Sequence, residues 1–94
     1  MSFIADEKLE EYAERHTTAP DSLLAELAAE TKATMSLPQM LTGPIEGRFL
    51  QQLVFATGAR RVLELGTYSG YSALSMAEGL PPDGRIDTLS LIHI

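Results

Sequence analysis

The residues whose types and spacing could do chemistry lie between Arg61 and Leu74 of this 94-residue chain. This stretch begins with a short apolar run around Glu64, passes through a turn from Gly66 to Gly70, and then continues in a helical pattern. In α/β proteins a strand, turn and helix in this order place the turn at the carboxyl end of a parallel strand, where small molecules bind. We therefore expect a ligand site at the turn.

Glu64 indicates which kind of ligand this site favours. A carboxylate would repel the two phosphate charges of a dinucleotide, whereas it would attract a ligand that carries an ammonium and a sulfonium group. The turn contains Gly66 and Gly70 but lacks the middle glycine of G-x-G-x-x-G, which lets the backbone approach a pyrophosphate. Both features favour a cationic ligand over a nicotinamide dinucleotide.

The same stretch resembles the first motif of class I S-adenosylmethionine-dependent methyltransferases. Within that class it is similar to the O-methyltransferases of the caffeoyl-CoA and catechol O-methyltransferase type. The matching residues are Glu64, the turn Gly66-Thr67-Tyr68-Ser69-Gly70-Tyr71-Ser72 and the helix Ala73 to Ala77. Upstream, the segments that look like the amino-terminal helices and cofactor-lid loop of bacterial members are Tyr12-Ala13, His16-Thr17-Thr18, Met40-Leu41-Thr42 and Gly47-Arg48-Phe49-Leu50. The likeness extends to about Arg85.

The resemblance implies S-adenosylmethionine as the cofactor and gives each site residue a role. Glu64 would hold the methionine ammonium, Gly66 and Thr67 would allow close backbone approach, and Ser72 and Thr42 would bind the methionine carboxylate. For Thr42 the alternative of a simple cap on the following helix stays open.

In the intact relatives the resemblance also implies a divalent cation, typically magnesium, which binds adjacent hydroxyls of a catechol-like acceptor, and a homodimer. The catalytic and metal-binding residues of that family lie beyond the second strand. We therefore expect no catalytic residue and no metal ligand within residues 1 to 94, and no methyl transfer by this chain on its own.

The fold class that follows is α/β. We expect the amino-terminal part of a Rossmann-like doubly wound sheet, preceded by helices and truncated after the second strand. Periodicity and capping signals predict helices at 6–15, 19–33, 44–57 and 70–79, and strands at 61–65 and 85–88. The strand at 61–65 is apolar enough to be buried on both faces, as parallel sheets usually are.

Two helices carry more specific expectations. The helix at 19–33 should begin with Thr18 as its cap, Pro20 in the first turn and an acid at Asp21. The helix at 44–57 repeats apolar residues at Ile45, Phe49, Leu53 and Ala56, which predicts that this face lies against the strand that follows.

The last six residues, 89–94, depart from the family pattern. The family would end the second strand in an acid that binds the ribose hydroxyls, whereas this chain has Leu-Ser-Leu-Ile-His-Ile. These residues equal an in-frame translation of the transposase end sequence that is attached to DNA fragments in library preparation. We interpret 89–94 as an adapter-derived foreign tail and give His93 no chemical role.

Composition excludes several classes of function. The formal net charge is -6 from 13 acidic and 7 basic residues, which argues against binding nucleic acid or an anionic membrane surface. Cysteine is absent, which excludes a disulfide framework and a thiolate metal site. No apolar run has the length of a signal peptide or membrane span, so we expect a cytoplasmic protein. Two alternatives to a methyltransferase stay open: a fragment of a nicotinamide-dependent Rossmann oxidoreductase, and a short non-catalytic helical protein that binds a partner.

Overall fold

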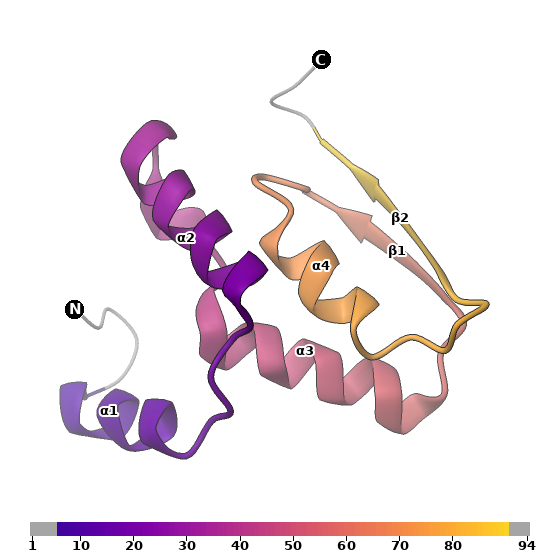
Figure 1. The fold of residues 1–94 in the computed structure, drawn as a ribbon, viewed down its shortest axis with the longest axis horizontal. Coiled ribbons are helices and arrows are strands. Elements are labelled where there is room, and N and C mark those ends of the chain that lie inside the picture. Colours follow the sequence, from indigo (N-terminus) through magenta and orange to yellow (C-terminus); the bar gives the residue numbers. More distant parts are fainter. Residues whose placement is uncertain (1–5, 91–94) are drawn as a thin grey trace.

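The computed structural model describes residues 6–90, in which helices cover one side of a two-stranded parallel sheet (Figure 1). The elements in chain order are α1 (Glu7–Arg15), α2 (Ser22–Thr34), a short 3-10 helix (Pro38–Met40), α3 (Gly43–Thr57), β1 (Arg61–Leu65), α4 (Tyr71–Ala77) and β2 (Arg85–Leu89). Figure 1 shows α4 between α2 and the strands, with α3 running across the base of both helices. Within residues 6–90 no helix is both long and apolar enough to cross a bilayer.

The predicted α/β fold class and the order of its elements are confirmed, and α4 connects the two parallel strands as expected. β2 extends to Leu89, one residue beyond the predicted end, and Leu89 pairs with Leu65. The carbonyl of Leu89 also accepts from the N–H of Gly66 at 2.8 Å and of Thr67 at 3.1 Å. Residues 91–94 lie outside the described part of the chain, so the foreign origin of 89–94 stays a prediction.

A small core forms where α4 packs on α3. Its buried apolar side chains are Leu24, Val54, Tyr71, Ala73 and Met76. Two glycines allow the helices to approach, because a Cβ added at Gly47 would lie 2.8 Å from the Ser75 Oγ and one added at Gly79 would collide with the backbone carbonyl of Gln51. The helix that carries the glycine turn is therefore held from behind by α3.

The predicted inner face of α3 is wrong. Ile45, Phe49 and Leu53 remain exposed, with Phe49 at 60% of its full exposure. The face that packs on α4 instead contains Gly47 and Val54, which are buried. A contact at a glycine brings two helix backbones closer than large side chains permit, so this narrower face makes the contact within residues 6–90.

Within the described residues, β1 is covered on one face only, although its composition would allow burial on both. Leu63, Leu65 and Leu89 on one face of the sheet are 67%, 75% and 56% exposed. On the other face, the side of the helices, Val62 and Glu64 are half-buried. The apolar character of a strand shows that it can be covered, but coverage depends on elements that pack on it.

The start of α2 needs correction as well. The helix begins at Ser22 and its cap is Asp21, whose Oδ1 accepts from the N–H of Leu24 at 2.9 Å. Thr18 does not cap it, because the Arg48 guanidinium binds the carbonyls of Thr18 and Ala19 and holds this segment outside the helix. Smaller differences in helix ends affect α1, α3 and α4, which were predicted as 6–15, 44–57 and 70–79. Asp6 and Gly70 are the N-caps of α1 and α4, not their first residues.

Candidate functional site

Glu64 lies at the centre of a small network of hydroxyl groups at the end of β1. Thr88 Oγ1 donates to Glu64 Oε1 at 2.7 Å, and the Ser72 hydroxyl donates to the other carboxylate oxygen. The hydroxyls of Thr67 and Thr88 are also hydrogen-bonded to each other, at 2.6 Å. Both oxygens of Glu64 are thus oriented, and each keeps a lone pair for a further donor.

Local structure explains why these groups meet. The parallel register pairs Glu64 with Thr88, which places their side chains on the same face of the sheet. Ser72 is the second residue of α4, which begins directly after the turn and folds back beside β1. The network therefore needs both strands and the helix between them.

The turn adopts a conformation that suits its glycines. Gly66 has φ +106° and Gly70 has φ +92°, in the region where residues with a side chain are strained. The N–H of Gly70 donates to the Thr67 carbonyl at 2.9 Å and closes the turn. Because the N–H groups of Gly66 and Thr67 bind the Leu89 carbonyl, these residues offer a close surface to a ligand instead of free donors.

A small hollow opens beside the turn. It is lined by Met40, Thr42, Gly66, Thr67, Tyr68, Ser69, Tyr71 and Ser72. Four of the five predicted site residues thus lie on one hollow, and the fifth, Glu64, is joined to it through the Ser72 hydroxyl. The hollow is small, so it could receive only one end of a cofactor-sized ligand.

The structure bears on one of the two roles considered for Thr42, that of a cap on α3. Thr42 immediately precedes α3, but its side chain makes no capping hydrogen bond. The capping alternative is therefore not realised, and the role of Thr42 in ligand binding stays a prediction.

Sequence reasoning missed the part played by Thr88, which it treated only as part of a strand. The predicted parallel pairing of 61–65 with 85–88 could have indicated this role, because it places Thr88 beside Glu64. It also missed the contact of Tyr68, whose hydroxyl lies 2.9 Å from the carbonyl of Ser36 and 3.1 Å from that of Leu37. No local pattern indicates this contact, because it joins residues more than 30 positions apart.

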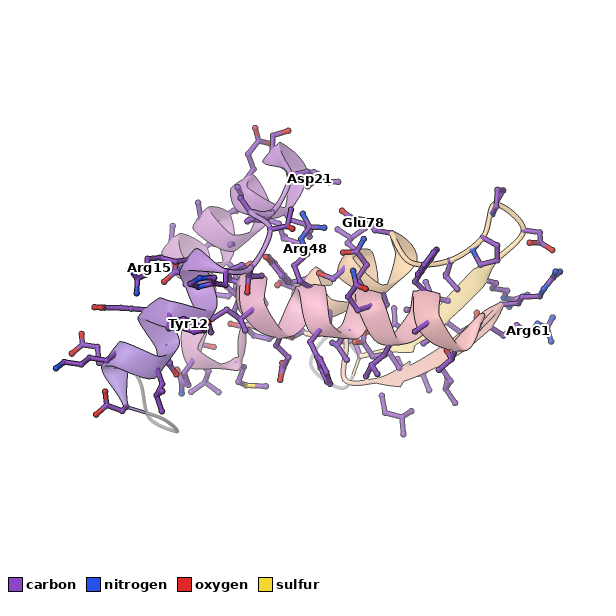
Figure 2. All side chains as sticks on the ribbon, turned by 90° about the horizontal axis from the view of Figure 1, so that it is seen from below. Tyr12, Arg15, Asp21, Arg48, Arg61 and Glu78 are labelled. Atoms are coloured by element: carbon purple, nitrogen blue, oxygen red, sulfur yellow. The ribbon has the colours of Figure 1, made fainter. Side chains whose placement is uncertain are left out.

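A charged cluster lies where α2, α3 and the end of α4 meet (Figure 2). Arg48 forms an ion pair with Glu78 at 3.2 Å. Burial raises the pKa of Glu78, and its hydrogen bond with Asp21 acts in the same direction. The N–H of Leu24 lowers the pKa of the Asp21 carboxyl, and Glu78 lowers it further. Desolvation raises the pKa of the buried Tyr71 hydroxyl.

Among residues 6–90, no three His, Cys, Asp or Glu side chains are grouped so as to hold a metal ion. The residues of this part therefore do not fit a divalent cation, and we derive no step of a reaction through one.

His16 ends α1, with its Nδ1 at 2.8 Å from the Tyr12 carbonyl and its ring stacked on the Tyr12 ring.

Curated relatives share this segment. Residues 14–92 match the family model described as O-methyltransferase. The catechol O-methyltransferase of Niastella koreensis is 44% identical over 69 residues, which are 73% of this chain and 30% of that protein. The caffeoyl-CoA O-methyltransferase of Populus kitakamiensis is 44% identical over 61 residues, which are 65% of this chain and 26% of that protein. The chain thus spans under a third of the length of these relatives.

Solved structures agree with the sequence comparison. The O-methyltransferase of Bacillus cereus, in complex with SAH, has a TM-score of 0.76 at 38% identity, covering 88% of this chain and 37% of that one. The O-methyltransferase TomG of Streptomyces achromogenes, in complex with SAM, has a TM-score of 0.75 at 33% identity, covering 86% of this chain and 36% of that one. These findings give no support to the nicotinamide-dependent alternative. With its glycine turn, its oriented Glu64 and a family match over most of its length, the chain belongs to the O-methyltransferase family.

Proposed function

We propose that the gene product containing this chain is an S-adenosylmethionine-dependent O-methyltransferase, and that residues 6–90 hold the methionine end of the cofactor. The observation that carries the proposal is the carboxylate of Glu64, oriented by two hydroxyls at a strand end beside a hollow. An oriented carboxylate is complementary to an ammonium group. The relatives that crystallised with SAM or SAH support the choice of this cation.

The residues of the hollow fit the methionine moiety. Glu64 would accept from the ammonium, while the hydroxyls of Thr42 and Ser72 would donate to the carboxylate. The Ser72 hydroxyl has one proton, with which it donates a hydrogen bond to Glu64. The carboxylate oxygens have lone pairs left to accept from the ammonium, and Ser72 could then turn its proton toward the ligand carboxylate.

The cofactor, when bound, supplies a sulfonium methyl group to an acceptor hydroxyl. We propose a small hydroxylated acceptor of the catechol type, because the curated relatives are named catechol and caffeoyl-CoA O-methyltransferases. The resemblance also supports a homodimeric cytoplasmic protein. Light scattering coupled to size exclusion tests the dimer, since a monomeric mass at micromolar concentration would exclude it.

Calorimetric titration of the gene product with S-adenosylmethionine and with NAD tests the cofactor. We expect S-adenosylmethionine to bind and NAD not to bind. Preference for NAD would support an oxidoreductase, and binding of neither would favour the interaction protein.

The variant Glu64→Gln tests the pocket itself. A hydrogen bond to a charged group is worth about 1.5–3 kcal/mol, so the loss of charge should weaken S-adenosylmethionine binding about 10- to 100-fold. Glu26→Gln, at an exposed position of α2, is the matched control and should bind like the parent protein. If Glu64→Gln bound as tightly as Glu26→Gln, this pocket would not be the cofactor site.

A further inference from the structure

The loop of residues 36–41, between α2 and α3, has one anchor in a distant part of the chain. The Tyr68 hydroxyl, in the glycine turn, lies within hydrogen-bonding distance of the carbonyls of Ser36 and Leu37, at 2.9 and 3.1 Å. The hydroxyl has one proton, which the two carbonyls share. Two segments more than 30 residues apart in sequence are thus joined by one side chain.

Other interactions of this loop are weak or local. Among the described residues, its remaining backbone hydrogen bond outside regular elements joins the N–H of Met40 to the carbonyl of Leu37, at 3.0 Å. Its large apolar side chains do not anchor it either, since Leu37 and Met40 are 54% and 53% exposed. Leu37 also has a φ of +58°, a strained conformation for a residue with a side chain. A loop of this kind depends on specific contacts for its position.

The Leu37 carbonyl connects the Tyr68 hydroxyl to a residue that lines the hollow. The Leu37 carbonyl that faces Tyr68 also accepts from Met40, and Met40 lines the hollow together with Thr42. Tyr68 itself has a φ of +50°, which the turn between Gly66 and Gly70 imposes and which determines where its side chain emerges. The strained turn and the loop are therefore joined through the Tyr68 hydroxyl.

We propose that the Tyr68 hydroxyl is a positioning group that holds residues 36–41, and through them Thr42, against the cofactor pocket. This inference rests on the proposed function only for the identity of the ligand. Tyr68 acts through the loop: the residue lines the hollow, and its hydroxyl contacts the loop carbonyls. Removing the hydroxyl should release the loop and weaken cofactor binding without removing any pocket wall.

The test is Tyr68→Phe in the gene product that contains this chain, because phenylalanine keeps the ring and loses only the hydroxyl. Tyr12→Phe is the matched control, since no described residue is hydrogen-bonded to its hydroxyl and it lies on exposed α1. Amide hydrogen exchange of residues 36–41 is measured without ligand, and the Kd for S-adenosylhomocysteine is measured by calorimetry. The net contribution of one hydrogen bond corresponds to about three- to tenfold in each quantity.

Tyr68→Phe should therefore speed exchange in 36–41 and raise the Kd by this factor, with exchange in α3 and α4 unchanged. Unchanged exchange in the loop would overturn the anchor, and faster exchange with an unchanged Kd would overturn its role in the pocket. If the parent protein bound no S-adenosylhomocysteine, the proposed function would fail, and exchange alone would still decide whether Tyr68 holds the loop.

Discussion

Thr88→Val is the substitution that most directly examines how Glu64 is held. Valine has nearly the shape of threonine and is favourable in a strand, so β2 should keep its pairing. The change removes the hydroxyl that donates to Glu64 Oε1 at 2.7 Å and contacts the hydroxyl of Thr67 at 2.6 Å. The Ser72 hydroxyl would remain as the one donor to the carboxylate among the described residues.

The magnitude follows from the burial of these groups. A hydrogen bond to a charged group contributes about 1.5–3 kcal/mol when water cannot replace it. Glu64 and Thr88 are only half-buried, so water can take over part of the bond, and we expect a loss near 1 kcal/mol in the free energy of unfolding. The same loss of orientation should weaken S-adenosylmethionine binding about fivefold.

Urea denaturation and calorimetric titration measure the two effects. Thr88→Ser keeps the hydroxyl and should restore cofactor binding, although it loses a methyl group from the sheet. The double variant Thr88→Val with Glu64→Gln should weaken binding by less than the sum of the single changes, because both act on one hydrogen bond. Strict additivity, or equal binding by the valine and serine variants, would show that Thr88 does not orient Glu64.

Two further predictions concern the support behind the site. Asp21 caps α2, so Asp21→Ala should lower the free energy of unfolding by about 1 kcal/mol in urea denaturation. Thr18→Ala should lower it by clearly less. A larger effect at Thr18 would show that Thr18, and not Asp21, caps the helix. Burial raises the pKa of Glu78 above its ordinary value of 4.5, so its contribution to stability is present below that pH and is lost as the pH rises through the folded-state pKa. Glu78→Gln cannot ionise, so its stability relative to the parent should increase between about pH 4 and pH 7. A constant difference across this range in urea denaturation would contradict the raised pKa.

The sequence could predict the elements whose causes are local. The apolar run before Gly66 and the glycines after it define the strand and the turn within ten residues, and β1 has the predicted bounds. Glu64 could be placed at the strand end for the same reason. The motif around it was specific enough to identify the family, and the family comparison confirms it.

Contacts between distant segments could not be read in this way. The apolar repeat of α3 predicts a buried face, yet α4 packs on the face of Gly47, since only the tertiary structure determines which side another helix approaches. The cap of α2 is Asp21 and not Thr18, because Arg48, some 30 positions away, binds the carbonyl groups of Thr18 and Ala19.

The sequence by itself therefore determined the kind of site: a carboxylate and a glycine turn at the end of a strand. Only the tertiary structure decided how that carboxylate is oriented and what holds the loop beside it. The backbone conformation of the turn and the charge at its start are set by residues next to one another in sequence. The partners of Glu64 and Tyr68 depend instead on the strand register and on the path of the loop between α2 and α3.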